Sequence, residues 1–301
     1  MPTNADTHGI LCLGRLYCDL LFTGLAAMPE LGRERFAEDF TLSAGGGAYI
    51  TAAHLAARGR RAFLASRLGL DSLSCALEAE LAASGVDLSH LERSAGAGPQ
   101  PTVALVRGSE RAFVSRRAGS ARPATLDAAL ADRRVRHLHI AEYATLHEIP
   151  GLIGQAKARG LTLSLDPSWD DALIRDPALL AACAGIDLFL PNEEELRAIT
   201  GCTGVEDGLD RLADTFPLTV VKRGGAGALL AGAGGRRLAM AAEAVSVVDT
   251  TGAGDAFNAG FLDAWLDGHG HRDCLAAAIA TGSASVGHAG GAPRARRPET
   301  S

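Results

Sequence analysis

Short apolar runs alternate with longer helical patterns along most of this 301-residue chain, and this alternation is the strongest constraint on its fold. Turn residues follow each run and lead into the next helical stretch, a pattern typical of β-α-β units and a largely parallel sheet. We expect strands at residues 10–13, 62–65, 137–140, 161–165, 187–190 and 218–222. We expect helices at residues 48–58, 73–84, 146–159, 193–199, 253–266 and 273–288.

Two segments, residues 20–42 and 101–115, instead show the alternation with period two that is typical of exposed strands. The second has the pattern of a β-hairpin, so the two segments predict a small second sheet at one edge, able to act as a lid. An edge hairpin without function would have the same pattern. We therefore expect one α/β domain over residues 1–290 with these lid strands inserted, and a disordered basic tail at residues 291–301 that contains Arg294, Arg296 and Arg297.

Composition excludes several classes of protein. A net charge of −6 with dispersed basic residues argues against a nucleic-acid partner. The chain has no apolar run of the roughly 18 residues that span a bilayer, and its start lacks a secretory signal, so we expect a cytoplasmic protein without a membrane anchor. Neither lysine, Lys157 or Lys222, precedes Ser or Thr, which excludes a Walker A loop. A nicotinamide-dependent oxidoreductase would share the alternation, but no G-x-G-x-x-G follows the first strand.

The sequence D-T-T-G-A-G-D at residues 249–255 places a glycine-rich turn directly before a helix. The amides of Gly252, Ala253 and Gly254 would converge at the positive end of the helix dipole, where an anion binds. Asp255 beside them would repel a phosphate, so a role as general base toward an attacking hydroxyl explains it better. An aspartate near a helix start is also favoured by the dipole alone.

Asp19 and a run of three glycines, residues 45–47, lie near the first β-α junction. Ligands of open α/β sheets bind beyond the carboxyl ends of the strands, and glycines let a polar ligand approach the backbone. A carboxylate such as Asp19 accepts hydrogen bonds from two adjacent hydroxyls of a polyol. Alternatively, Asp19 solvates a loop and the glycines form a tight turn.

Two later motifs have both a structural and a functional interpretation. Asn192 and Glu195 fit a helix capping box, and they also suit a magnesium ion held partly through its waters. The cation Lys222 precedes a turn with Gly224 and Gly227, which could cover nucleotide phosphates or form a plain hairpin.

Six motifs follow one another along the chain: Asp19, Gly45-Gly46, Glu110-Arg111-x-Phe113, Asn192-x-x-Glu195, Gly224-x-x-Gly227 and the run from Asp249 to Asp255. Together they resemble the ribokinase-like, PfkB-type family of carbohydrate and nucleoside kinases over nearly the whole chain. The resemblance implies an α/β fold in which helices flank a mostly parallel central sheet and a small β-sheet forms a lid. It also implies ATP-dependent transfer to a primary hydroxyl, and a homodimer formed through the lid.

The resemblance also implies roles for individual residues. Asp255 resembles the family's base, and the amides of residues 252–254 resemble its anion hole. The residues implied to bind ATP or magnesium are Asn192, Glu195, Lys222, Gly224, Gly227 and Gly254. The residues implied to face the acceptor are Asp19, Gly45, Gly46, Asp255 and, as a weaker match, Glu142. A monovalent cation is an additional candidate cofactor.

One departure from the family concerns the acceptor. Where many members that phosphorylate sugars carry Asn, this chain has Ile50, preceded by Tyr49. This apolar pair would suit a less polar acceptor face, such as a nucleoside base, although Ile50 in the helix core explains the change equally well. We expect an ATP- and magnesium-dependent kinase for a small sugar. An adenosine-type nucleoside kinase and a non-catalytic sugar or nucleoside sensor stay as alternatives.

Overall fold

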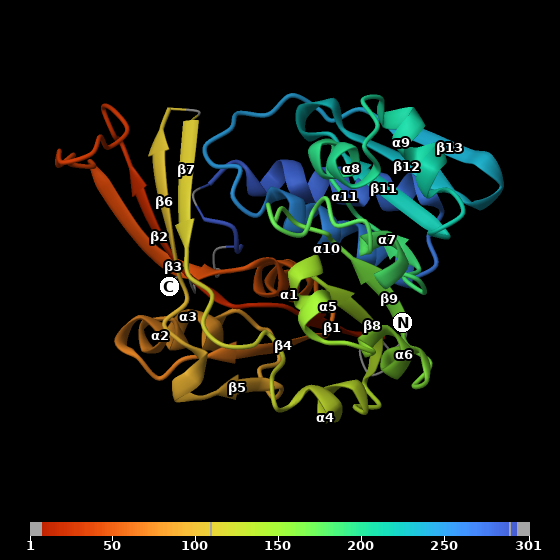
Figure 1. Cartoon of the computed structure of the whole chain (residues 1–301), viewed down its shortest axis with the longest axis horizontal. Coiled ribbons are helices and arrows are strands. Elements are labelled where there is room, and N and C mark those ends of the chain that lie inside the picture. Colours follow the sequence, from red (N-terminus) through yellow and green to blue (C-terminus); the bar gives the residue numbers. More distant parts are fainter. Residues whose placement is uncertain (1–7, 109, 289, 294–301) are drawn as a thin grey trace, which may run out of the picture.

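The computed structural model describes residues 8–108, 110–288 and 290–293, and within these residues the strands form two sheets (Figure 1). The larger has nine strands in the order β13-β12-β11-β10-β9-β8-β1-β4-β5. All its pairs are parallel except β11–β12 and β12–β13. The strands are β1 (Gly9–Leu13), β4 (Ala62–Leu68), β5 (Leu91–Arg93), β8 (Val135–Ile140), β9 (Thr162–Leu165), β10 (Leu188–Phe189), β11 (Leu218–Lys222), β12 (Ala228–Gly232) and β13 (Arg236–Met240).

Helices cover both faces of this sheet and form two hydrophobic cores. Along β1, Ile10 and Cys12 face one core while Leu11 and Leu13 face the other, so both sides of the strand are apolar. The first core is covered by α1 (Gly47–Ala57), α2 (Ser72–Ala76), α3 (Glu78–Ala83), α10 (Ala253–Leu266) and α11 (His271–Ser285). The second is covered by α4 (Leu126–Leu130), α5 (Tyr143–Glu148), α6 (Leu152–Lys157), α7 (Leu179–Ala182), α8 (Glu193–Thr200) and α9 (Val205–Leu212).

The smaller sheet stands beside the main one and has the strand order β3-β2-β6-β7 (Figure 1). Its strands are β2 (Tyr17–Thr23), β3 (Asp39–Gly45), β6 (Pro101–Arg107) and β7 (Glu110–Ser115). The pair β6–β7 is the predicted hairpin, while β2 and β6 are parallel. We call this sheet the lid.

The predicted fold class is confirmed: helices flank a mostly parallel central sheet, and a small second sheet stands at one edge. Two predicted helices were wrong in extent. Residues 146–159 form two helices because Pro150 interrupts the pattern and Gly151 has φ of 78°. Residues 73–84 also divide into two, α2 and α3, on either side of Leu77.

Other features were not predicted or stay untested. The sequence did not predict α4, α7, α9 or β5. The domain boundary at residue 290 stays a prediction, and the three arginines of the predicted tail lie outside the described residues. In the part of the chain that the structure describes, no helix has the length and apolar composition needed to cross a bilayer.

Candidate active site

The turn before α10 has a backbone conformation that favours glycine. Gly252 has φ of 71°, and a Cβ there would lie 2.7 Å from the Cα of Gly291. Among the described residues, the amides of Gly252 and Gly254 have no acceptor. The amide of Ala253 differs, because it donates to the carbonyl of Thr250 at 3.2 Å. Two of the three predicted amides are therefore available to an anion at the positive end of the helix.

Asp255 lies in the first turn of α10, and its carboxylate approaches the glycine turn that precedes α1. A Cβ on Gly47 would lie 2.8 Å from Asp255 Oδ1. In the described structure this carboxylate has no hydrogen-bond or ion-pair partner. Removal from water, and then the charge of Asp166, raise the pKa of Asp255 to about 7, although Lys222 opposes the shift. An unpartnered carboxylate that titrates near neutral pH suits a general base.

Asp19 lies within lid strand β2, so the alternative interpretation of Asp19 as a loop residue is wrong. A Cβ on Gly45 would overlap the carboxylate of Asp19. A Cβ on Gly46, where φ is 96°, would collide with the carbonyl oxygen of Arg15 in the loop between β1 and β2. Removal from water, followed by the charges of Glu80 and Asp249, raises the pKa of Asp19 to about 7. Like Asp255, it has no hydrogen-bond or ion-pair partner among the described residues.

The turn of residues 45–47 thus separates two unpartnered carboxylates, Asp19 at one end and Asp255 at the other. The charge of Asp19 acts on Asp255, so the two carboxylates are near enough to interact. We call the region of Asp19, residues 45–47 and Asp255, where we expect an acceptor to bind, the acceptor crevice. Two carboxylates without donors need hydroxyl or amine groups from a ligand.

Lys222, at the end of β11, forms a buried ion pair with Asp166, which directly follows β9. Asn258 on α10 donates a second hydrogen bond to Asp166 at 2.6 Å. Burial lowers the pKa of Lys222, but the charges of Asp166 and Glu195 outweigh burial and raise it overall. Asp166 was not predicted from the sequence. Its position directly after an expected strand was the available signal.

Asn192 and Glu195 form the predicted capping box at the start of α8. The amide of Asn192 donates to Glu195 Oε2 at 2.8 Å, and the amide of Glu195 donates to Asn192 Oδ1 at 2.8 Å. Removal from water and the charge of Asp166 raise the pKa of Glu195 to about 7. The structural interpretation of this motif is therefore correct, and its role toward a metal stays a prediction.

The donor set decides how magnesium would bind. The described residues contain no cluster of three or more His, Cys, Asp or Glu side chains that could hold a metal. Glu195 is 5% exposed, and Asp166 is already paired with Lys222. These residues fit a hydrated ion held mainly by nucleotide phosphates, because magnesium retains several waters, and they do not fit a bare ion.

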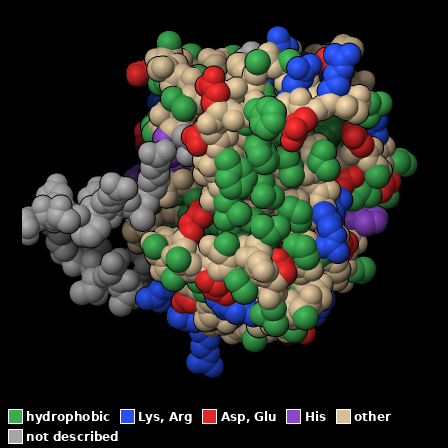
Figure 2. Space-filling view, turned by 90° about the vertical axis from the view of Figure 1, so that its left-hand side faces the viewer, with side chains coloured by type: hydrophobic (Ala, Val, Ile, Leu, Met, Phe, Trp, Pro, Cys, Tyr) green, Lys and Arg blue, Asp and Glu red, His purple; other side chains and the backbone are tan. Residues whose placement is uncertain are grey.

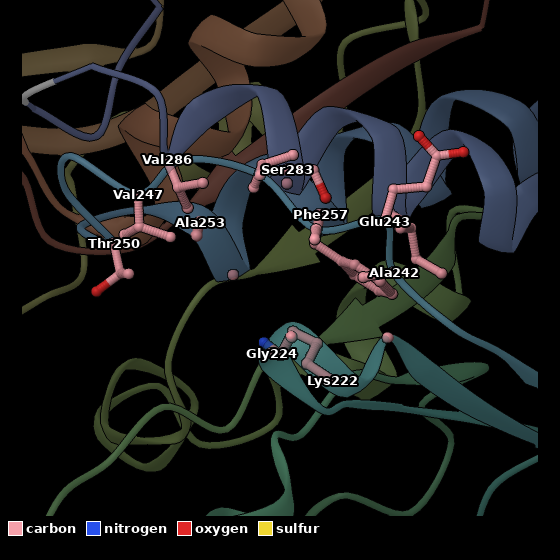
Figure 3. Close-up of a pocket in the computed structure, with 17 residues that line it drawn as sticks. Lys222, Gly224, Ala242, Glu243, Val247, Thr250, Ala253, Phe257, Ser283 and Val286 are labelled. Carbon is pink, nitrogen blue, oxygen red and sulfur yellow. The ribbon is translucent and has the colours of Figure 1, made fainter.

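A cavity of about 420 Å³ lies between the β11–β12 turn and helices α10 and α11 (Figure 3). All four predicted nucleotide residues of this region line it, Lys222, Gly224, Gly227 and Gly254. Gly227 has φ of 89°, and a Cβ there would collide with the carbonyl of Met240, so the turn requires glycine. Most of the remaining wall is formed by small and apolar side chains, among them Val245, Val247, Phe257, Ile279, Ser283 and Val286, and Glu243 adds one carboxylate.

The lid contacts the anion-binding turn through Arg111 on β7. Its guanidinium pairs with Asp249 Oδ1 at 2.9 Å and donates to Thr251 Oγ1 at 3.1 Å. The Asp249 carboxylate also accepts from the amides of Thr251 and Gly290. We call this contact the Arg111 latch. The motif containing Arg111 was recognised in the sequence, but its partners were not.

Three further residues were predicted near the acceptor. Tyr49 is 1% exposed and packs in the first core, which argues against the predicted contact with a substrate. Ile50 is also buried and lies against Gly252 and Gly291, so it supports the anion-binding turn from the core. Glu142 follows β8 beside the crevice, where it accepts from the amide of Arg15 at 3.3 Å and from Thr145 at 2.7 Å.

Comparison with known proteins identifies the class of protein that this fold and site define. The family model for pfkB family carbohydrate kinases matches residues 10–296, and the chain therefore belongs to that family. Among solved structures, a PfkB protein from Polaromonas sp. JS666 is 28% identical with a TM-score of 0.74, covering 92% of this chain and 95% of that one. Arabidopsis thaliana ribokinase complexed with ribose and ATP has a TM-score of 0.76 at 22% identity, covering 94% of each chain.

The curated relatives carry different activities. A fructokinase from Klebsiella pneumoniae is 41% identical over 40% of this chain and 41% of its own length. The matches to a cytidine kinase from Thermococcus kodakarensis and an A. thaliana ribokinase cover 46% and 37% of those proteins, so this chain matches less than half of each. An ATP-dependent ribose-1-phosphate kinase from Halopiger xanaduensis is 28% identical over 87% of both chains.

Proposed function

We propose that the protein transfers the γ-phosphoryl group of ATP to a primary hydroxyl of a small sugar or sugar-like acceptor. The observation that carries this proposal is the position of Asp255, an unpartnered carboxylate beside the free amides of Gly252 and Gly254. A hydroxyl between them would meet a base on one side and an electrophile held by amides on the other.

In this mechanism Asp255 removes the proton from the hydroxyl as its oxygen attacks the γ-phosphorus. The bond from phosphorus to the bridging oxygen breaks, and ADP leaves toward Lys222. The amides of Gly252 and Gly254 stabilise charge on the transferred group. Magnesium, when bound, neutralises the phosphates, and its waters would meet Asn192 and Glu195. The cavity beside Gly224 would hold the base of ATP, and a monovalent cation stays a candidate cofactor.

The assay for this proposal measures ADP release over a panel of sugars and nucleosides, with wild-type protein and two variants. Asp255→Asn should lower kcat by about 10³- to 10⁴-fold, because the base is lost while the shape is kept. Asp273→Asn is the matched control, since Asp273 is likewise the third residue of a long helix, α11, but lies on the surface. Near-normal turnover of Asp255→Asn would reject the assigned role.

A nucleoside acceptor is the second candidate. Phe113 shares the inner face of the lid with Arg111, because it lies two residues further along β7, and its ring is 56% exposed. An exposed aromatic ring above the crevice could stack on a base. A catalytically idle binder of sugars or nucleosides would bind members of the panel without releasing ADP.

We also propose a homodimer formed through the lid. Figure 2 shows apolar side chains gathered on the side of the molecule where the lid lies. Cross-strand register places Phe22, Phe40, Leu105 and Val114 on the lid face opposite Asp19, and Phe40 is 49% exposed. An apolar face of this kind marks a contact with another protein. Sedimentation of wild-type protein and Phe40→Glu tests it, because the charge should leave only monomer.

A further inference from the structure

The charge of the acceptor crevice restricts the class of acceptor. The base, Asp255, and the hydroxyl ligand, Asp19, have no partner among the described residues. Two further carboxylates lie close by. Glu80 accepts from the amide of Ala44 at 2.8 Å, next to Gly45, and Glu142 follows β8 at the other side. A ligand between Asp19 and Asp255 therefore meets negative charge from several directions.

Within residues 8–108, 110–288 and 290–293, the basic side chains that border the crevice do not offset this charge for a ligand. Arg15 is 4% exposed and pairs with Glu148 at 2.7 Å. Arg117 is beside Tyr17 on the inner lid face and pairs with Asp170 at 2.5 Å. Each guanidinium is thus already held by a carboxylate.

Two further described cations near the crevice are engaged in the same way. Arg111 pairs with Asp249 in the latch, and Lys222 pairs with Asp166 on the nucleotide side. An anionic group on the acceptor would share a cation whose charge a carboxylate already offsets, so the net charge around it would stay negative. A hydroxyl or an ammonium group meets no such repulsion, because it donates hydrogen bonds to carboxylates.

We infer that the acceptor carries no anionic group: it is a neutral polyol, an amino sugar or a nucleoside, and not a sugar phosphate or a sugar acid. This inference rests on the proposed kinase function and narrows it. It separates this chain from its relative named an ATP-dependent ribose-1-phosphate kinase, despite 28% identity over 87% of both chains.

The experiment compares acceptors that differ in charge. Ribose, fructose, adenosine and glucosamine are measured against ribose 1-phosphate and 2-keto-3-deoxygluconate, by calorimetric binding and by ADP release. Because a like charge a few ångströms away costs about 100-fold in a partly screened site, both anions should bind and react at least about 100-fold more weakly than the strongest uncharged or cationic acceptor. An anionic acceptor that matches the neutral ones overturns the inference.

Binding and turnover separate this inference from the kinase proposal. If neutral or cationic acceptors bind without ADP release, the proposed kinase function is refuted, while the inference that the acceptor carries no anionic group is supported. If only an anionic acceptor binds, the inference that the acceptor carries no anionic group is refuted, whether or not ADP is formed.

A variant tests whether Asp19 is the source of the discrimination. Asp19→Asn should weaken the binding of neutral acceptors about 100-fold, because hydrogen bonds to a charged carboxylate are lost. The ratio of the affinity for neutral acceptors to the affinity for anionic acceptors should fall about tenfold. The control Asp214→Asn changes net charge equally at an exposed position after α9 and should leave the ratio unchanged. An unchanged ratio in Asp19→Asn, with its affinities lowered equally, would overturn the role of Asp19 in selecting charge.

Discussion

The nucleotide side and the acceptor side of the site are built in opposite ways. The proposed nucleotide cavity is lined by residues between 222 and 286, a single stretch of chain that forms one apolar slot with a cation at its end. The acceptor crevice is assembled from distant segments, with Asp19 and Arg111 from the lid, the turn of residues 45–47, Glu142 and Asp255. The first has the shape that we propose for binding a flat base, and the second is a set of negative charges that would bind hydrogen-bond donors of a ligand.

This difference has a thermodynamic consequence. The slot is closed by packing and gains affinity from apolar contact, whereas the crevice keeps two carboxylates without partners, which costs stability until a ligand supplies donors. Activity at such a site is gained at the expense of stability. The predictions below change one side and measure whether the other responds.

Among the changes that distinguish the two sides, filling the slot should give the largest effect. Ser283 on α11 faces the cavity (Figure 3), and Ser283→Trp would place an indole where the base binds. The KM for ATP should rise about 100-fold, because the lost contacts are those of a base-sized ligand, on the order of 3 kcal/mol. Calorimetric affinity for the acceptor should stay within about twofold. Ser283→Ala is the matched control, and an unchanged KM for ATP in the tryptophan variant would contradict the assignment of the cavity.

The contrast between the two sides also explains what the sequence could predict. The nucleotide motifs are local, so residues such as Lys222, Gly224 and Gly227 were recognised from a strand followed by a glycine-rich turn, and the same cavity contains them. The central parallel strands of the main sheet were also predictable, because buried parallel strands are apolar on both faces, whereas the edge strands β5 and β13 were not predicted. Their ends differ from the prediction by up to three residues, as at β4 (Ala62–Leu68).

The acceptor side was harder to predict because its contacts are distant in sequence. The latch joins Arg111 to a threonine 140 residues away, and on the nucleotide side the one unpredicted residue, Asp166, is likewise 56 residues from its partner Lys222. The periodicity of apolar residues along the chain does not indicate which distant residues form such a pair. Tyr49 shows the converse error: its place beside the glycines suggested a contact with substrate, but the helical turn directs the ring into the core.

Removing the Arg111 latch tests whether the lid and the turn before α10 act together in turnover. Arg111→Ala leaves Asp249, which is 5% exposed, without its cation, and the turn that carries Gly252 loses its link to the lid. We expect kcat/KM for the acceptor to fall about 30-fold, while the affinity for ATP alone changes little, because the lid does not line the nucleotide cavity.

Two controls separate this positioning role from simple loss of fold. Guanidinium ion at millimolar concentration should restore part of the activity of Arg111→Ala, and Arg111→Lys should keep an intermediate rate. Pairing Arg111→Ala with Asp249→Asn should cost less than the sum of the two single changes, because the unpaired charge disappears. Additive losses without rescue would argue that the latch has no role in turnover.

The smallest expected effect, a pH dependence, follows from the two acceptor-side carboxylates. The pKa values of Asp19 and Asp255 are both raised to about 7, and each group acts in its charged form. kcat/KM for the acceptor should therefore rise with pH and level off above about 8, with a fall of about tenfold or more between pH 8 and pH 6. Binding of ATP alone should follow this profile only weakly, since Lys222 stays charged throughout.

Stability should change with pH in the opposite direction. An acid whose pKa is raised by folding binds its proton more tightly in the native state, so it stabilises the fold at low pH and loses that contribution as the pH rises toward 7. Asp255→Asn carries no such charge. Its advantage in Tm over wild type should therefore grow as the pH rises from about 4 to about 7, and should be about 2 °C or more larger at pH 8 than at pH 5. A Tm advantage that is constant with pH would mean that Asp255 is not desolvated. The proposed contrast between an apolar nucleotide cavity and an acceptor crevice with unpartnered carboxylates would then be wrong.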